Sequence, residues 1–186
     1  MIKLKDLLLE GKPPSIFVPR RMEDRVERLI NLYIRNGSKG YLNLRQMNLN
    51  KLPDILKNVN VGGSFNCSVN NLTSLENAPK SVDGDFYSSG NELTSLVGAP
   101  KTVGEDFYCS YNLLTSLEGA PETVGGDFYC GYNKLTSLAG VPKYVGGIFV
   151  CNDNPGNFTE EQVRAVCDVK GEVLALPKKL PRLKKV

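Results

Sequence analysis

Acidic and phenolic side chains recur at a fixed interval of twenty-one residues in this 186-residue chain. Each aspartate stands two positions before a tyrosine, and in two copies a second tyrosine follows three positions later. The eight residues are Asp85, Tyr87, Asp106, Tyr108, Tyr111, Asp127, Tyr129 and Tyr132. Carboxylates attract a basic group, and tyrosine is enriched among the hot spots of protein interfaces. The pattern predicts a partner-binding surface. Duplication of a scaffold that already contained these residues would give the same pattern, so both explanations stay open.

The types of residue present bear on catalysis and metal binding. The three aspartates could attract calcium, but they come without a ligand-supplying loop, so we predict no metal site. The chain contains no histidine, which removes the commonest general base and any Ser-His or Cys-His pair. None of the five cysteines forms a Cys-x-x-Cys motif. We therefore predict that the chain is not an enzyme and needs no cofactor.

Four of the cysteines share the twenty-one-residue register: Cys67, Cys109, Cys130 and Cys151. In that position we expect them to be small buried apolar residues. Free thiols stacked in a core fit a reducing compartment.

The repeat unit itself predicts the architecture, because a fixed period of this length indicates a solenoid. Phenylalanine opens five units, asparagine follows five positions later in each, and Leu-Thr-Ser-Leu comes next in four of them. Strand alternation sends the phenylalanine and cysteine side chains inward and the aspartate and tyrosine side chains outward. The asparagine amides are expected to bind turn backbone. Ala-Pro and Val-Gly-Gly exclude a helix from the remainder, which should be extended or turn-like.

The pattern Phe107-x-Cys109-x-x-Asn112-x-Leu114 resembles the Leu-x-Leu-x-x-Asn-x-Leu core of leucine-rich repeats. The short period and the Pro-containing linker are similar to the short-repeat bacterial class found in secreted effectors. The resemblance covers roughly residues 41–157. It implies an α/β solenoid with a parallel β-sheet on its concave face and helical caps at both ends. It also implies a non-enzymatic module that binds a partner protein through the concave face.

The chain divides into five predicted segments. They are residues 1–21 (N-terminal leader or extended basic segment), 22–40 (N-terminal cap helix), 41–157 (leucine-rich repeats), 158–176 (C-terminal cap helix and strand) and 177–186 (basic tail). In the first cap, Val26, Leu29, Ile30 and Tyr33 follow the helical spacing of a buried stripe.

The second cap carries a capping signature, because Thr159 is followed by Gln162 at the required spacing. We expect Val163, Val166 and Cys167 to form its buried face. Residues 173–176 are expected to add a last strand.

Charge is unevenly distributed along the chain. Residues 62–156 carry four lysines and ten acidic residues, whereas the remainder carries nineteen basic and ten acidic residues, for an overall net charge of +3. The basic ends leave open a contact with nucleic acid or another anionic surface. No segment has the run of about twenty apolar residues that spans a membrane, and no signal peptide is recognised. We expect a cytoplasmic monomer.

Leu8-Leu9-Glu10, followed by Gly11, resembles the sites cut by the head-maturation proteases of T-even-type phages. This resemblance implies processing after Glu10, a phage protein that acts on a host target, or a packaged or structural virion component. An ordinary chain end would carry the same three residues, so that explanation also stays open.

Overall fold

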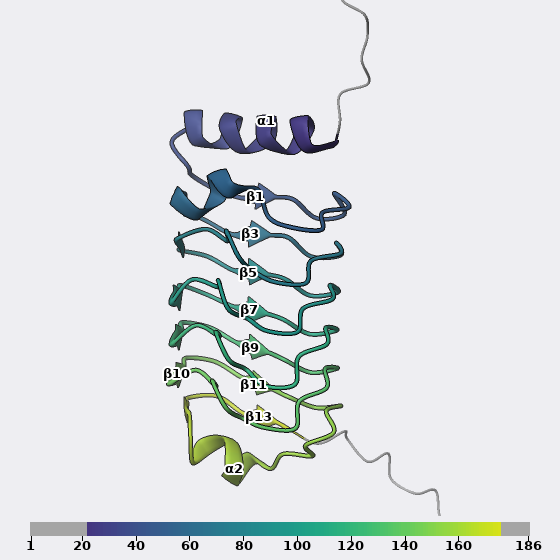
Figure 1. The fold of residues 1–186 in the computed structure, drawn as a ribbon. Coiled ribbons are helices and arrows are strands. Elements are labelled where there is room, and N and C mark those ends of the chain that lie inside the picture. Colours follow the sequence, from purple (N-terminus) through teal and green to yellow (C-terminus); the bar gives the residue numbers. More distant parts are fainter. Residues whose placement is uncertain (1–21, 176–186) are drawn as a thin grey trace, which may run out of the picture.

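The computed structural model describes residues 22–175, which wind into coils stacked one below another from α1 to α2 (Figure 1). Each regular coil contributes two short strands, one to each of two parallel sheets. The seven-stranded sheet contains β1 (Leu42–Asn43), β3 (Phe65–Asn66), β5 (Phe86–Tyr87), β7 (Phe107–Tyr108), β9 (Phe128–Tyr129), β11 (Phe149–Val150) and β13 (Val173–Leu174). The six-stranded sheet contains β2 (Asn60–Val61), β4 (Ser81–Val82), β6 (Thr102–Val103), β8 (Thr123–Val124), β10 (Tyr144–Val145) and β12 (Asp168–Val169). The fold is therefore a parallel leucine-rich solenoid, as predicted.

The phenylalanines form one continuous column in the core. Phe65, Phe86, Phe107, Phe128 and Phe149 are fully buried, and consecutive ring centroids lie 5.1–5.5 Å apart. The four cysteines that share the repeat register are also buried beside them, and all five cysteines are free thiols. Valines of the six-stranded sheet and both leucines of the Leu-Thr-Ser-Leu motifs also line the core, with Leu138 partly buried. The inward positions predicted from strand alternation are confirmed.

An asparagine follows each strand of the seven-stranded sheet in the regular repeats, and both polar atoms of its side chain form hydrogen bonds to the backbone. Nδ2 of Asn112 donates to the carbonyl oxygens of Cys109 in the same coil and Ser88 in the previous coil, both at 3.1 Å. Its Oδ1 accepts the backbone N–H of Leu93 at 3.1 Å. The same arrangement recurs at Asn91, Asn133 and Asn154. The asparagine column therefore satisfies backbone groups that the short strands leave free.

The glycines between the two sheets allow neighbouring coils to approach closely. A Cβ atom added to Gly125 would overlap the carbonyl oxygen of Gly104 in the coil above. Any side chain here would push the coils apart.

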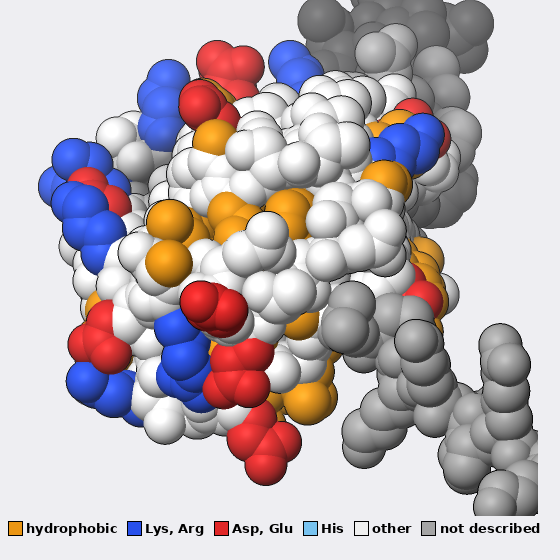
Figure 2. Space-filling view, turned by 90° about the horizontal axis from the view of Figure 1, so that it is seen from below, with side chains coloured by type: hydrophobic (Ala, Val, Ile, Leu, Met, Phe, Trp, Pro, Cys, Tyr) orange, Lys and Arg blue, Asp and Glu red, His pale blue; other side chains and the backbone are white. Residues whose placement is uncertain are grey.

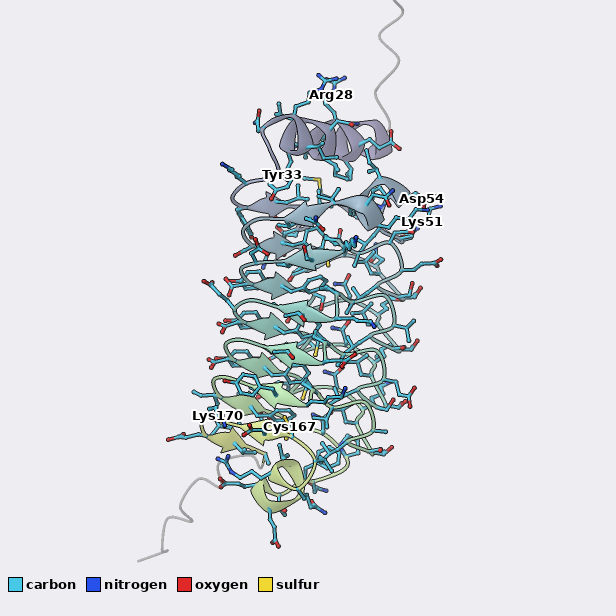
Figure 3. All side chains as sticks on the ribbon, turned by 90° about the vertical axis from the view of Figure 1, so that its left-hand side faces the viewer. Arg28, Tyr33, Lys51, Asp54, Cys167 and Lys170 are labelled. Atoms are coloured by element: carbon cyan, nitrogen blue, oxygen red, sulfur yellow. The ribbon has the colours of Figure 1, made fainter. Side chains whose placement is uncertain are left out.

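A helix covers the N-terminal end of the stack. Helix α1 (Met22–Arg35) buries Val26, Ile30 and Tyr33 against the first coil. In Figure 3, Tyr33 points from α1 toward that coil and Arg28 points away from it. The Tyr33 hydroxyl donates to the carbonyl oxygen of Ser38 at 2.6 Å, which fixes the turn after the helix. A 3₁₀ helix, η2 (Asp54–Asn58), follows the first coil.

Helix α2 (Glu160–Arg164) covers the other end, and its predicted capping box is present. The Thr159 hydroxyl accepts the Gln162 backbone N–H at 3.2 Å, and the Gln162 side chain accepts the Thr159 backbone N–H at 2.9 Å. Val163 and Cys167 are buried as expected. The expectation for Val166 is wrong, because α2 ends at Arg164 and the Val166 side chain is 53% exposed in the turn that follows.

Several predictions concern residues outside the described range. They are the leader and its processing residue Glu10, the basic tail at 177–186, and residue 176 of the expected last strand; within the described range that strand is present as β13. Among residues 22–175, no helix has both the length and the apolar character needed to cross a membrane.

Candidate partner-binding face

The eight residues predicted from the sequence lie along the outward side of the seven-stranded sheet and the turns that follow it. Strand register places Tyr87 beside Tyr108, and Tyr108 beside Tyr129. Their rings stack with centroids 4.7 and 4.6 Å apart and are parallel within 7°. Tyr111 and Tyr132 form a second stack, with centroids 4.5 Å apart. We call these five tyrosines the tyrosine face.

Hydrogen bonds connect the aspartates to the scaffold. Oδ1 of Asp106 accepts the backbone N–H of Asp127 in the next coil at 2.7 Å, and Oδ2 accepts the hydroxyl of Tyr108 at 2.8 Å. Asp85 and Asp127 make the equivalent pairs of bonds. Each carboxylate therefore uses one oxygen to hold the next coil and the other to orient a tyrosine. The backbone N–H of the next coil, whose hydrogen carries a partial positive charge, therefore lies between neighbouring aspartates that would otherwise repel one another.

The half-buried tyrosines are neutral at ordinary pH. Burial, followed by the hydrogen bond to the adjacent aspartate, raises the pKa of Tyr87 and of Tyr129 to about 12. The same causes raise the pKa of Tyr108 further. These three phenols act as hydrogen-bond donors to the aspartates, and their rings are fixed in orientation.

Tyr111 and Tyr132, which we call the outer tyrosine pair, differ from the other three. Their side chains are 60% and 47% exposed. Their backbones have φ angles of 57° and 54°, in the left-handed region that a bulky residue rarely occupies. Gly90 holds the same position in the preceding coil with a φ of 69°, without this cost. Exposed aromatic residues in a strained backbone are typical of binding sites.

Two contributors to this surface were not predicted. Leu113 is 37% exposed and stands two residues after Tyr111. Glu92 is exposed at the equivalent position of the preceding coil. Both share the twenty-one-residue register of the tyrosines, so following that register two positions further along each turn would have found them.

Two hollows lie elsewhere, beside the N-terminal cap. One, of about 690 Å³, is lined by Val26, Met47 and Ile55 with Lys51 and Asp54 at its edge (Figure 3). The other, of about 680 Å³, lies between the end of α1 and η2. Neither lining includes a residue of the tyrosine face.

The C-terminal end of the stack has a mixed surface. Figure 2 shows acidic and basic side chains side by side there. Two exposed ion pairs belong to this region, Arg164 with Glu160 at 2.8 Å and Lys170 with Asp168 at 2.9 Å. Within residues 22–175, no group of three or more His, Cys, Asp or Glu side chains is arranged to hold a metal ion.

Comparison with known proteins adds a likeness of fold. No protein-family model matches the sequence, and no curated protein matches it. A solved structure described as "Structure of Shigella effector LRR domain" is similar at 23% sequence identity, over 84% of this chain and 78% of that one, with a TM-score of 0.46. The assignment of a leucine-rich solenoid rests on the strand pairing of this chain itself.

Proposed function

We propose that this chain is a non-enzymatic recognition module that binds a partner protein through the tyrosine face. The observation that carries the proposal is the outer tyrosine pair. Tyr111 and Tyr132 are the most exposed residues of that face, and each places a large aromatic ring on a left-handed backbone that glycine adopts without cost in the preceding coil. Solenoids use extended surfaces of this kind to bind other proteins.

The surroundings of the pair support a partner with basic or mixed charge. Residues 62–156 carry a net charge of −6, from four lysines and ten acidic residues. Leu113 adds apolar area beside Tyr111. An aromatic centre with a charged rim is the usual composition of a protein interface.

The test compares two variants of the full chain. Tyr111→Ala combined with Tyr132→Ala removes the outer tyrosine pair, and Val97→Ala removes an apolar side chain that is 62% exposed outside the tyrosine face. A partner selected with the unaltered chain should bind the Val97→Ala chain equally and the double variant at least tenfold more weakly, because hot-spot truncation costs about 2 kcal/mol or more. Equal binding by all three folded chains would rule out this face.

We further propose that the partner is a host protein and that the chain is of phage origin, with a packaged virion component as the alternative. These proposals rest on the resemblance of Leu8-Leu9-Glu10 to a phage processing site. The mass of the chain isolated from its natural source tests them. A mature chain that begins at Gly11 supports packaging, and an intact Met1 removes that support.

A further inference from the structure

The stack of the outer tyrosine pair does not continue into the preceding coil, because the equivalent position there is Gly90, which has no side chain. In the column of positive-φ residues, Val69, Gly90, Tyr111, Tyr132 and Asp153 occupy consecutive coils. Their backbones are joined in register, as Gly90 donates its N–H to Ser110 and Val69 donates to Ser89. Tyr111 stacks on Tyr132 with one face of its ring, so its other face is directed toward the coil of Gly90.

Space is present beside this uncovered ring face. The three atoms nearest to a Cβ placed on Gly90 all belong to Val69, at 3.6–3.9 Å, which is ordinary van der Waals contact. Tyr111 is also more exposed than Tyr132, at 60% against 47%. The position beyond Tyr132 carries the side chain of Asp153, whereas the position beyond Tyr111 is Gly90. We call this space, between Val69 and Tyr111 and above Gly90, the Gly90 gap.

The dimensions of the Gly90 gap suit one planar group. Val69 and Tyr111 are two coils apart, about 9.6 Å at the usual spacing of neighbouring strands. A flat group in contact with both sides needs about 7–8 Å, because each contact distance is about 3.5–4.0 Å. Val69 is itself 41% exposed, so the gap is open to solvent on its outer side.

The charge beside the gap selects among planar groups. Glu92 lies two residues after Gly90 in the same coil, and its side chain is exposed. Its column neighbours in the adjacent coils are Asn71 and Leu113, neither of which is charged. Among the described residues, Glu92 makes no ion pair. A planar cation would therefore gain both ring stacking on Tyr111 and a carboxylate partner.

We propose that the Gly90 gap binds an arginine side chain of the partner protein, with its guanidinium stacked on Tyr111 and paired with Glu92. Arginine has a planar side-chain group that is always charged, and it combines stacking on aromatic faces with carboxylate pairing. This inference rests on the proposed function, since it assigns one partner residue to one place on the tyrosine face.

The experiment uses the isotope-labelled full chain and three small probes, followed by NMR. The probes are the N-acetyl methylamides of arginine, of citrulline (planar but neutral) and of lysine (charged but not planar). The arginine probe should shift the Gly90 amide and Tyr111 ring signals in a saturable manner. It should bind roughly fivefold more tightly than either of the other two, the size of an exposed cation–π contact.

Three variants test the location. Gly90→Tyr extends the stack into the gap, in a backbone conformation that Tyr111 and Tyr132 already adopt, and should abolish the arginine response. Gly90→Asn, which tolerates the left-handed region and is small, serves as its control and should retain the response. Glu92→Gln should lower arginine binding to the level of citrulline while the fold is unchanged.

Arginine-induced shifts that lie elsewhere, or that persist in Gly90→Tyr, would overturn this inference. A different result would contradict the proposed function. If the whole partner still binds Gly90→Tyr but not the Tyr111 and Tyr132 double variant, the tyrosine face is the binding surface and the arginine assignment is wrong. If the partner binds both variants normally, the proposed function itself is lost.

Discussion

The Oδ1 atom of Asp106 accepts the backbone N–H of Asp127 at 2.7 Å, across the junction between two coils. Two aspartates of the same charge thus stand in neighbouring coils with a hydrogen bond from the main chain of one to the side chain of the other. Ser64 occupies this position one coil before Asp85, and its hydroxyl accepts the Asp85 backbone N–H at 3.1 Å. The repeated aspartate therefore stabilises the stack, whether or not a partner also contacts it.

Replacement of Asp106 by alanine should lower the free energy of unfolding by about 2–3 kcal/mol. The change removes the acceptor of the Asp127 N–H and of the Tyr108 hydroxyl, and an unsatisfied half-buried donor costs about 1–3 kcal/mol. Urea denaturation measures the loss. Glu105→Ala, at an exposed neighbouring residue, is the control and should change stability by less than about 0.5 kcal/mol. Similar losses in both variants would contradict a structural role for the carboxylate.

The asparagine column should be more sensitive. Asn112 is buried, and Asn112→Ala removes the acceptor of the Leu93 N–H. It also removes one of the two asparagine donors to each of two carbonyl oxygens, those of Ser88 and Cys109. We expect a loss of about 3–5 kcal/mol, because the unsatisfied buried N–H costs about 1–3 kcal/mol and each of the two lost hydrogen bonds to a carbonyl about 0.5–1.5 kcal/mol. Asn71→Ala removes an exposed asparagine from the equivalent turn two coils earlier and should cost under about 1 kcal/mol. Thermal and urea unfolding of the two variants can be compared directly.

The sequence predicted the stack and its inward columns, because the twenty-one-residue period is visible when the repeats are compared. It also predicted both caps, from helical spacing at one end and a capping signature at the other. It did not predict the six-stranded sheet. Val-Gly-Gly was interpreted only as a helix breaker, whereas Gly104 and Gly125 allow close approach of the coils and Val103 and Val124 pair in register. Close approach between coils is a property of two repeats in contact, so the pattern within one repeat does not contain it.

The candidate site was predicted as a set of residues but not as a division of roles. In the sequence, Asp106 and Tyr108 look equally available to a partner, yet in the structure the Tyr108 hydroxyl donates a hydrogen bond to Asp106. Tyr111 differs from Tyr108 in its backbone conformation, and nothing in the residue type reports a φ of 57°. The glycine at position 90 was the available signal, because a glycine in the same register indicates that the position favours a positive φ.

The half-buried phenols should titrate abnormally. Burial and the aspartate hydrogen bond raise the pKa of Tyr129 to about 12, whereas an unfolded tyrosine has a pKa of about 10. A raised pKa in the folded chain means that the folded state favours the protonated phenol. The stabilisation of the fold by protonated Tyr129 is therefore complete below pH about 10 and is lost as pH rises from about 10 to 12. The tyrosinate absorbance of the native chain minus that of Tyr129→Phe should develop near pH 12, and development near pH 10 would contradict the buried, bonded geometry.

The cysteine column should be chemically inert in the native chain. Burial raises the pKa of Cys151 to about 12 and that of Cys167 to about 11. It also raises the thiol pKa values of Cys67, Cys109 and Cys130. The thiolate is the reactive form, so alkylation at pH 8 should be far slower than in denaturant, where all five thiols should react. Mass spectrometry counts the modified cysteines. Rapid labelling of the native chain at Cys109 or Cys130 would show that the stack opens readily.

The outer tyrosine pair should affect binding far more than stability. Tyr111→Asn removes the ring stacking, worth about 0.5–1.5 kcal/mol, but also relieves about 1 kcal/mol of left-handed strain, because asparagine enters this region readily. The two terms nearly cancel, so the free energy of unfolding should stay within about 1 kcal/mol of its original value. Partner affinity should nevertheless fall at least tenfold, since truncation of a central aromatic residue in an interface costs about 2 kcal/mol or more. A loss of stability of about 3 kcal/mol with unchanged affinity would show instead that Tyr111 serves the scaffold, and the strain at its backbone would then need another explanation.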